Sequence, residues 1–264
     1  MELKLKDKIA FISGSTSGIG FATAKMLLAE GMQVYINGRS STGVTKAVDE
    51  LKAQVKGAKV FGIVADFKKP QEVQELTNQI PEVDVLINNA GFGLFGPFYS
   101  TNWNRESSML NLHVVTTTQL TKLLLDGMIK RGRGKILNIS SLAAFQPGPL
   151  MAIYYASKAY ILSFSEAIAN ELKGTGVTVT VLCPGQTKTS FQEVVSEGNK
   201  TNKISFNIAN ASKVAEYGYK AMMRGKTLAI PGVTNKILSF LPRILPRKIA
   251  TAIVRKIQEK NREL

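Results

Sequence analysis

Residues 9–20 of the chain read IAFISGSTSGIG and join a short apolar run to three closely spaced glycines. The apolar run predicts a buried strand, and an amphipathic helix begins directly after the last glycine. Gly14 suits a tight turn, Gly18 lets the backbone approach a pyrophosphate, and Gly20 permits close packing of the helix on the strand. The stretch therefore predicts a phosphate-binding turn. An ordinary βα loop is the alternative, because the spacing departs from the G-x-G-x-x-G pattern.

Outward from this turn, short apolar segments alternate along the chain with longer segments of helical period. Strands are predicted at residues 9–13, 34–37, 60–65, 83–88, 135–140, 177–183 and 227–230. Helices are predicted at residues 19–30, 44–55, 71–79, 102–130, 154–172 and 212–224. Strands that are apolar along their whole length are typical of a parallel sheet between two layers of helices. The sequence therefore predicts an α/β fold, a doubly wound parallel sheet of the Rossmann type, in one domain at residues 1–232.

Composition excludes several kinds of site. With 264 residues, 44% of them hydrophobic, the chain is long enough for one large α/β domain. Cys183 is the only cysteine, so an internal disulfide and a cysteine-based metal cluster are excluded, and we expect no metal site. The only histidine, His113, leaves no Ser-His-Asp triad readily available and is interpreted as a helix residue with a satisfied hydrogen bond. Neither a signal peptide nor a spanning helix is expected, so the predicted location is cytoplasmic, at most peripheral to a membrane.

The chain is strongly basic, with 34 Lys and Arg against 19 Asp and Glu and a formal net charge of +15. Nucleic acid, an anionic membrane face, or an anionic cofactor or substrate would fit this charge. A solvated basic surface is the alternative. Because the lysines are mostly scattered along the chain, we expect no nucleic-acid partner.

The tail, residues 233–264, belongs to no βα unit and is predicted to be a basic, amphipathic helical extension. One helical stripe within it holds Ile249, Ala250, Ile253, Val254 and Ile257. Basic residues occupy much of the remaining circumference. The stripe is typical of a helix that packs on the domain or on a second subunit. A helix that lies on an anionic membrane surface, with its apolar side buried, is the alternative.

The end of the second predicted strand bears on the choice of cofactor. Dinucleotide sites commonly place an acidic residue there, which binds the ribose 2′-hydroxyl. Here residues 34–40 read VYINGRS, with Arg39 and no carboxylate. Because the planar guanidinium of arginine suits phosphate, such a site would prefer NADP(H), with NAD(H) as the second choice. A surface arginine without a ligand is the alternative.

Further motifs follow predicted strands or open predicted helices. They are Asn88-Asn89-Ala90-Gly91, Asn138-Ile139-Ser140-Ser141, Tyr154-Tyr155-Ala156-Ser157-Lys158, and Pro184-Gly185 followed by Thr189. With residues 14–20, these motifs have the order and spacing of the short-chain dehydrogenase/reductase family, which the chain resembles in its one-domain form from about residue 5 to residue 232. The resemblance implies an NAD(P)(H)-dependent oxidoreductase that transfers a hydride between the nicotinamide cofactor and a carbonyl or alcohol substrate. It also implies a homodimer or homotetramer.

Tyr154 and Lys158 stand four residues apart, so both project from one face of a predicted helix. A nearby ammonium favours the phenolate, so we expect the pKa of Tyr154 to lie below the usual value of about 10. The resemblance implies that Tyr154 exchanges a proton with the substrate oxygen and that Lys158 also binds the nicotinamide ribose. Tyr155 is the rejected candidate, because the residue four places after it is Ala159.

The resemblance implies two further catalytic residues and a set of cofactor contacts. Ser141 would hydrogen-bond the substrate oxygen, whereas its neighbour Ser140 would be structural. Asn111 would anchor a proton-relay water, and an asparagine that caps or bends its helix is the alternative. Asp66 resembles the residue that contacts the adenine ring. The full set of implied cofactor contacts is Gly14, Ser15, Thr16, Ser17, Gly18, Ile19, Gly20, Arg39, Asp66, Asn89, Ala90, Gly91, Tyr154, Lys158, Pro184, Gly185, Thr187 and Thr189.

Residues 92–99, 142–153 and 186–210 are expected to border the substrate pocket. The first two segments carry the apolar residues Phe92, Leu94, Phe95, Phe98, Phe145, Leu150 and Met151. A lipophilic ketone or aldehyde is therefore the hypothesis for the substrate, and a role of these residues in the core or a subunit interface is the alternative. A dinucleotide-binding regulatory or scaffold protein without turnover is the second candidate function. The complete catalytic set argues against it, since a sensor has no need of a tuned acid or base.

Overall fold

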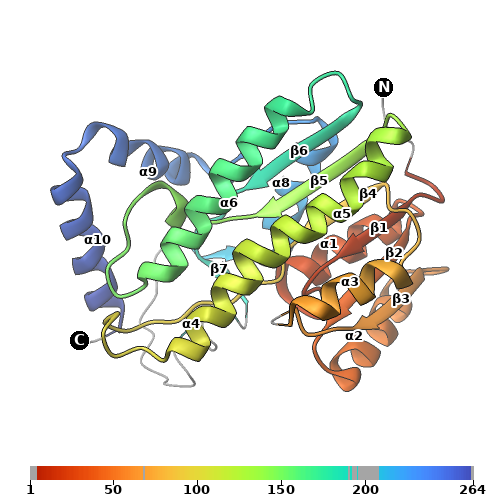
Figure 1. The fold of residues 1–264 in the computed structure, drawn as a ribbon, viewed down its shortest axis with the longest axis horizontal. Helices are drawn as coiled ribbons and strands as arrows, with labels where there is room; N and C mark the ends of the chain where they lie inside the picture. Colours follow the sequence, from red (N-terminus) through yellow and green to blue (C-terminus); the bar gives the residue numbers. More distant parts are fainter. Residues whose placement is uncertain (1–4, 68, 190, 192–194, 196–207, 263–264) are drawn as a thin grey trace.

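A parallel sheet of seven strands in the order β3-β2-β1-β4-β5-β6-β9 forms the centre of the protein (Figure 1). The computed structural model describes residues 5–67, 69–189, 191, 195 and 208–262. The strands are β1 (Ile9–Ile12), β2 (Gln33–Gly38), β3 (Lys59–Val64), β4 (Val85–Asn88), β5 (Gly134–Ile139), β6 (Val177–Leu182) and β9 (Leu228–Ala229). Every predicted strand is present, and the doubly wound parallel fold is confirmed.

Helices cover both faces of the sheet. They are α1 (Gly18–Ala29), α2 (Ser41–Gln54), α3 (Pro70–Gln79), α4 (Trp103–Leu110), α5 (Thr117–Lys130), α6 (Ala152–Glu171) and α8 (Ala211–Met223). Because successive strand residues face opposite sides, Ile87 packs into one core with α1, α2 and α8. Its neighbour Leu86 packs into a second core with α3, α5 and α6. The central strands, such as β4 and β5, are therefore buried on both faces, as their apolar sequences predict, whereas the edge strand β3 is mostly exposed.

The strand order reverses between β1 and β4, which are neighbours in the sheet although β2 and β3 come between them in sequence. In doubly wound sheets, ligands bind in the crevice beyond the carboxyl ends of the strands at this reversal. The turn after β1 and the loop after β4 meet there. The strand order alone therefore predicts where the ligand-binding site lies.

The helix predicted at residues 102–130 contains a π-helical segment, Asn111–Thr116, between α4 and α5. Figure 1 shows α4 and α5 as one long helical run. A π segment inserts an extra residue into a helix and is rare, and it is found often at functional sites. Two short strands, β7 (Thr187–Lys188) and β8 (Ala209–Asn210), and a 3₁₀ turn at Leu142–Phe145 were also not predicted.

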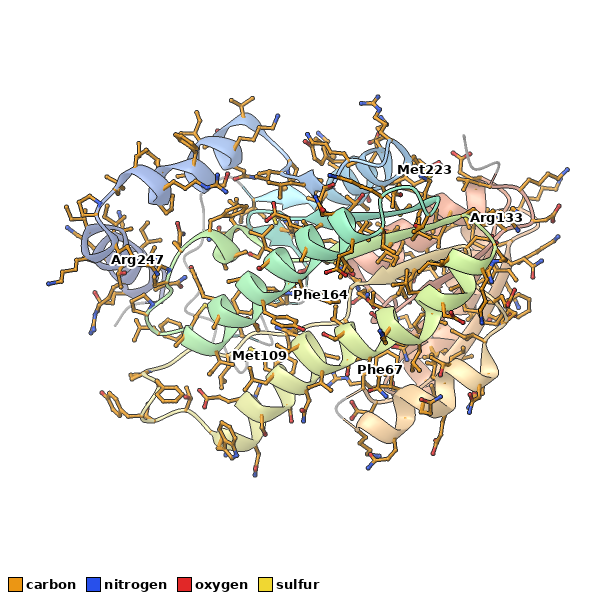
Figure 2. All side chains as sticks on the ribbon, turned by 45° about the horizontal axis from the view of Figure 1, so that its top comes forward. Phe67, Met109, Arg133, Phe164, Met223 and Arg247 are labelled. Carbon is orange, nitrogen blue, oxygen red and sulfur yellow. The ribbon has the colours of Figure 1, made fainter. Side chains whose placement is uncertain are left out.

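The tail forms two helices, α9 (Val233–Ile244) and α10 (Arg247–Arg262). Figure 2 shows Arg247, at the start of α10, at the end of the molecule opposite Arg133. Only part of the predicted apolar stripe is buried. Ala250 and Val254 are each 5% exposed, and Val254 packs in a cluster with Tyr155. The remaining members of the stripe, Ile249, Ile253 and Ile257, are about half exposed. Among the described residues, no helix combines the length and apolar character needed to cross a membrane.

Candidate active site

A cleft of about 1470 Å³ opens at the carboxyl ends of the strands. Its walls come from the turn after β1, the ends of β2 to β6, the first turns of α6, and the tail helices α9 and α10. This volume exceeds the roughly 300–1,000 Å³ typical of a site for one small molecule. The cleft therefore has room for a dinucleotide together with a second ligand.

The glycine turn after β1 has a conformation that favours glycine. Gly14 and Gly18 have φ values of 59° and 61°, in the left-handed region. At Gly14 an added Cβ would also lie 2.7 Å from the Cα of Ala90, so this contact requires a glycine. Asn37 holds the turn in place: its Oδ1 accepts from the Gly14 backbone N–H at 3.1 Å, and its Nδ2 donates to the Ala65 carbonyl at 3.2 Å.

The predicted contacts in residues 14–20 divide into two groups. Gly14, Thr16, Ser17, Gly18 and Ile19 line the cleft. Ser15 is fully buried behind it, where its hydroxyl donates to the Ile12 carbonyl at 2.7 Å and accepts from the Asn37 backbone N–H. Gly20 allows close packing, because an added Cβ would lie 2.5 Å from Nδ2 of Asn89. Ser15 and Gly20 therefore shape the turn from within.

Asn89 and Ser13 join the glycine turn to the loop after β4. Nδ2 of Asn89 donates to the carbonyls of Ser13 and Gly14, at 3.1 and 2.7 Å. The Ser13 hydroxyl accepts from the backbone N–H groups of Asn89 and Ala90, each at 3.0 Å. These bonds join β1 to β4, where the strand order reverses, and fix the turn after β1 relative to the loop after β4.

The far end of the cleft lies at the ends of β2 and β3. Arg39 is exposed and lines the cleft there, as does Asp66. Gly38 packs against Thr16, because an added Cβ would lie 2.5 Å from the Thr16 Cγ2. Arg39, which is predicted to select the cofactor, therefore directly follows Gly38, which contacts the glycine turn. Of the other predicted contacts, Ala90, Gly91, Pro184, Gly185, Thr187 and Thr189 also line the cleft.

Ser141, Tyr154 and Lys158 all line the cleft beside these loops. Lys158 is 5% exposed, and its Nζ donates to the Ile139 carbonyl at 3.0 Å and lies 5.8 Å from the centre of the Tyr154 ring. Ser140 donates to the Lys158 carbonyl at 2.8 Å, which agrees with the structural role predicted for it. The structure therefore brings three of the four predicted catalytic residues together.

Asn111, the fourth, is the first residue of the π segment and is partly buried. Its helix neighbours Ser108 and Leu112 line the cleft, whereas Asn111 is not among the described residues that do so. The predicted site residue is thus adjacent to the cleft wall. The alternative, that this asparagine caps or bends its helix, stays a prediction, and the residue stands where the helix geometry changes from α to π.

A family model for short chain dehydrogenases matches residues 8–200 of the chain. The chain belongs to the short-chain dehydrogenase/reductase family. It is 36% identical over 201 residues to uncharacterized oxidoreductase YvrD of Bacillus subtilis (strain 168), which covers 75% of this chain and 75% of that protein. It is 34% identical over 220 residues to dehydrogenase/reductase SDR family member 4 of Bos taurus, which covers 80% of this chain and 78% of that protein.

Solved structures agree with this membership. A 7beta-hydroxysteroid dehydrogenase structure has a TM-score of 0.83 and 25% identity, covering 97% of this chain and all of that one. Family members from Burkholderia phymatum, in complex with NAD, and from Sphingobium yanoikuyae, in complex with NADPH, have TM-scores of 0.82 and 0.79. Each is 22% identical and covers 91% of this chain, with 94% and 97% of the respective structures covered. This short-chain dehydrogenase/reductase is an oxidoreductase that transfers a hydride between a nicotinamide cofactor and a carbonyl or alcohol substrate.

Burial moves the pKa values of Tyr154 and Lys158 of this oxidoreductase in opposite directions. Loss of solvent raises the pKa of Tyr154 to about 12, although a hydrogen bond with Ser141 partly lowers it. The same loss of solvent lowers the pKa of Lys158 to about 8, because burial disfavours each charged form. The expectation that the pKa of Tyr154 lies below its usual value is therefore wrong for this structure, because desolvation of the phenolate is the largest influence on it.

The segments expected to border the substrate contribute unequally. Phe92 and Met151 line the cleft, whereas Leu94 and Leu150 are buried and Phe98 is 60% exposed. Phe95 and Phe145 pack against core clusters. From residues 186–210, the cleft is lined by Gln186, Thr187, Thr189 and Phe191. Residues 190, 192–194 and 196–207 of that segment lie outside the described residues.

The tail supplies cleft residues that the sequence reasoning missed. These are Asn235, Leu238, Ile257, Gln258 and Lys260. Nε2 of Gln258 donates to the Tyr155 hydroxyl at 2.8 Å, which links α10 to the first turn of α6. The amphipathic stripe in the sequence indicates which face of α10 is apolar, but it does not indicate what that face covers. The only sign in the sequence that Gln258 makes a specific contact is its position as a polar residue at the edge of the apolar stripe.

The lowered pKa of Lys158 predicts how activity depends on pH. Below about pH 8 the lysine is an ammonium, and above it the charge is lost, whereas Tyr154 keeps its proton up to about pH 12. We therefore expect kcat/KM for carbonyl reduction, which reports ionisations of the free enzyme, to fall about tenfold per pH unit above pH 8. The measurement is an initial-rate profile from pH 6 to 10, with circular dichroism as the control for folding. A flat profile up to pH 10 contradicts the prediction.

Proposed function

We propose that Tyr154 is the acid/base of the hydride-transfer reaction, with Lys158, Ser141 and Asn111 as its partners. The observation that carries the proposal is that Ser141, Tyr154 and the buried Lys158 line one cleft together, with the Lys158 Nζ 5.8 Å from the centre of the Tyr154 ring. Two hydroxyls side by side can bind one substrate oxygen, and Tyr154 can then give it a proton or take one. Lys158 supports the site with its charge. Asn111, on the π segment behind the wall, would anchor the water through which the lysine is reprotonated.

The cleft residues fit a dinucleotide. The bound nicotinamide supplies or accepts the hydride. The open turn at Gly14 and Gly18 would receive the pyrophosphate at the N-terminus of α1, where free backbone N–H groups favour an anion. Lys158 would bind the nicotinamide ribose, and Asp66 would lie near the adenine. The remaining proposed contacts are Ser15, Thr16, Ser17, Ile19, Gly20, Asn89, Ala90, Gly91, Pro184, Gly185, Thr187 and Thr189, of which Ser15, Gly20 and Asn89 also hold the turn and loop in shape.

The acid/base role is tested by Tyr154→Phe, which removes only the hydroxyl. We expect turnover to fall on the order of 10²- to 10⁴-fold, because that is the usual contribution of a positioned acid or base. Cofactor affinity, measured by fluorescence titration with NADPH, should stay near the native value. Tyr155→Phe is the matched control, since it removes a neighbouring hydroxyl that is bonded to Gln258. If Tyr155→Phe is the inactive variant and Tyr154→Phe is active, the assignment is wrong by one residue.

We further propose that NADP(H) is the preferred cofactor, with NAD(H) as the second choice. Arg39 supports this, because it is exposed at the cleft beside the Gly38–Thr16 contact, where a ribose 2′-phosphate would lie. A guanidinium binds phosphate through charge-assisted hydrogen bonds. The likeness to structures with NAD and with NADPH concerns the fold and does not decide between the two cofactors.

Arg39→Asp tests the preference. One charge-assisted hydrogen bond contributes roughly 1.5–3 kcal/mol, so we expect NADPH affinity to fall on the order of 10- to 150-fold. Affinity for NADH should change little or improve, because the new carboxylate can bind the ribose 2′-hydroxyl. Both dissociation constants are measured by fluorescence titration of the native protein and the variant. If the native protein binds NADH more tightly than NADPH, the proposal is wrong.

The substrate proposed is a lipophilic ketone or aldehyde, or the corresponding alcohol. Support comes from the apolar side chains at the cleft, which include Phe92, Leu142, Met151, Phe191 and Leu238. One of the similar structures described above, which covers 97% of this chain, is named for a hydroxysteroid, a lipophilic alcohol. A screen of carbonyl compounds that differ only in apolar bulk, with NADPH consumption as the readout, tests this substrate class. The rival function, a dinucleotide-binding scaffold without turnover, predicts no consumption with any compound.

We also propose a homodimer or homotetramer in the cytoplasm. Support for assembly comes from Val115, Leu123 and Ile129, which are 37–42% exposed on the π segment and α5 and could pack against a second copy. Support for the location comes from Cys183, the only cysteine in the sequence and a free thiol, so the domain is built without an internal disulfide. Residues 233–264 are proposed as an extension of the domain at residues 1–232.

Peripheral contact with an anionic membrane is the further role proposed for the tail. Residues 233–262 carry eight Lys or Arg and one acidic residue. Between these charges, α9 exposes Val233, Ile237, Phe240 and Ile244 by 57–72%, at the spacing of a single helical stripe. An apolar stripe with basic flanks fits the interface of an anionic bilayer. A second copy of the chain is the alternative occupant of this stripe.

Vesicle co-sedimentation tests the membrane contact with the full chain. Ile237→Ser with Phe240→Ser should move the protein from the pellet to the supernatant, because each buried apolar side chain contributes roughly 1.5–3 kcal/mol. Phe61→Ser with Val64→Ser, exposed apolar residues on the edge strand β3, is the matched control and should leave sedimentation unchanged. The vesicles contain anionic lipid at low salt. Native protein that stays in the supernatant overturns the membrane contact, and a smaller oligomer of the tail variant would assign the stripe to a second copy.

A further inference from the structure

His113 lies inside the π segment and is completely buried. Its Nε2 accepts a hydrogen bond from the backbone N–H of Phe92 at 3.2 Å. Its Nδ1 lies 2.8 Å from the Ser157 hydroxyl, which in turn donates to the Tyr154 carbonyl at 2.8 Å. The sequence predicts a satisfied hydrogen bond for His113, and the structure gives its ring two. The two bonds connect different parts of the active site.

Only one form of the imidazole satisfies these bonds. The Phe92 backbone N–H can only donate, so Nε2 carries no proton and Nδ1 must carry it. The Ser157 oxygen accepts this Nδ1 proton, because its own hydrogen is used toward the Tyr154 carbonyl. Burial and the nearby charge of Lys158 hold the pKa of His113 well below its usual value of 6.5. The ring is therefore neutral and has no nitrogen left over for proton transfer.

The two bonded partners belong to different elements of the protein, the loop after β4 and the helix α6. Phe92 follows Gly91 in the loop after β4, on the side proposed for the cofactor. An added Cβ on Gly91 would lie 2.8 Å from Nε2 of His113, so loop and ring are in close contact. The ring also lies edge-on to the Tyr154 ring, with the ring centres 6.0 Å apart. His113 is thus a rigid spacer between the cofactor-side loop and the first turns of α6.

We infer that His113 is a positioning residue, whose Nε2 fixes the loop at Gly91–Phe92 and whose Nδ1, through Ser157, fixes the turn of α6 that carries Tyr154. The inference rests on the proposed role of Tyr154. It assigns separate consequences to the two nitrogens. The Nε2 bond supports binding of the cofactor, and the Nδ1 bond supports the rate of proton transfer. Because hydride and proton transfer need both parts in register, one ring that contacts both can set their spacing.

The effects of the Nε2 bond and of the Nδ1 bond can be measured separately with two amide variants. In His113→Asn the amide reaches the position of Nδ1 and can bond Ser157, but it falls short of Phe92. In His113→Gln the amide oxygen reaches the position of Nε2 and can accept from Phe92, while the bond to Ser157 is lost. We expect the Asn variant to bind NADPH up to about tenfold more weakly with kcat near native. The Gln variant should show the opposite split, with kcat lower by up to about tenfold.

Two further variants complete the series. Ser157→Ala removes the Nδ1 partner together with the bond to the Tyr154 carbonyl, and it should lower kcat at least as much as the Gln variant does. His113→Phe keeps a ring without either bond and should show both defects. NADPH affinity is measured by fluorescence titration, kcat at saturating cofactor, and the thermal midpoint of each variant serves as the control for folding. If the Asn and Gln variants lower the thermal midpoint but leave both affinity and kcat native, His113 is an ordinary core residue and the inference is overturned.

A spectroscopic readout is independent of turnover. His113 is the only histidine, so the ¹⁵N signals of imidazole nitrogens in the native protein at pH 7 belong to it alone. We expect the shifts of a neutral ring protonated at Nδ1, and a ring protonated at Nε2 overturns the inference. Failure of the proposed function is distinguishable, since it would appear as an active Tyr154→Phe variant. In that case the NADPH affinities of the Asn and Gln variants still report on the loop.

Discussion

The hydrogen bonds that Ser13, Asn37 and Asn89 make hold together the two loops on which the rest of the site depends. All three side chains are buried or partly buried, and their bonds run between β1, β2 and the loop after β4. A buried polar group that loses its partner costs roughly 1–3 kcal/mol, so such a network is stable only when complete. When the network is complete, it keeps the glycine turn open and at a fixed distance from Ala90 and Gly91. The apolar sheet supplies the stability of the fold, whereas this small polar network supplies the shape of the crevice.

Burial is the second constraint, and it acts on the chemistry. Tyr154 and Lys158 lie four residues apart on α6, and removal of water makes the neutral form of each more favourable. The phenol thereby becomes a poorer acid and the amine a poorer base than in solution. An ionised ligand bound in the cleft would change this balance, because a charge within a few ångströms acts strongly where solvent is excluded. The site is therefore tuned jointly by the protein and by what it binds.

Much of the fold and a good part of the site could be predicted from the sequence. Strands such as Ile9–Ile12 are apolar on both faces, and this pattern needs no knowledge of distant residues. The cluster of Ser141, Tyr154 and Lys158 was predicted because its motifs follow strands or open helices in a fixed order. The π segment was not, because an extra residue in a helix hardly disturbs a hydrophobic pattern read over residues 102–130. The pKa of Tyr154 was mispredicted for a related reason: helix spacing shows the nearby amine but not the desolvation.

The tail illustrates what a local pattern leaves open. Its stripe predicts an apolar face, yet only Ala250 and Val254 of that face are buried, and the polar Gln258 reaches the hydroxyl of Tyr155. Tyr155 is 103 residues away in sequence, so no periodicity within α10 could reveal the contact. Gln258 bonds Tyr155, the residue next to Tyr154, and His113 of the π segment bonds Ser157, whose hydroxyl donates to the Tyr154 carbonyl. The start of α6 is thus fixed by partners from the tail and from the π segment, the two elements least like a regular βα unit. Elements outside the repeating pattern of the fold therefore position the residue proposed to carry its chemistry.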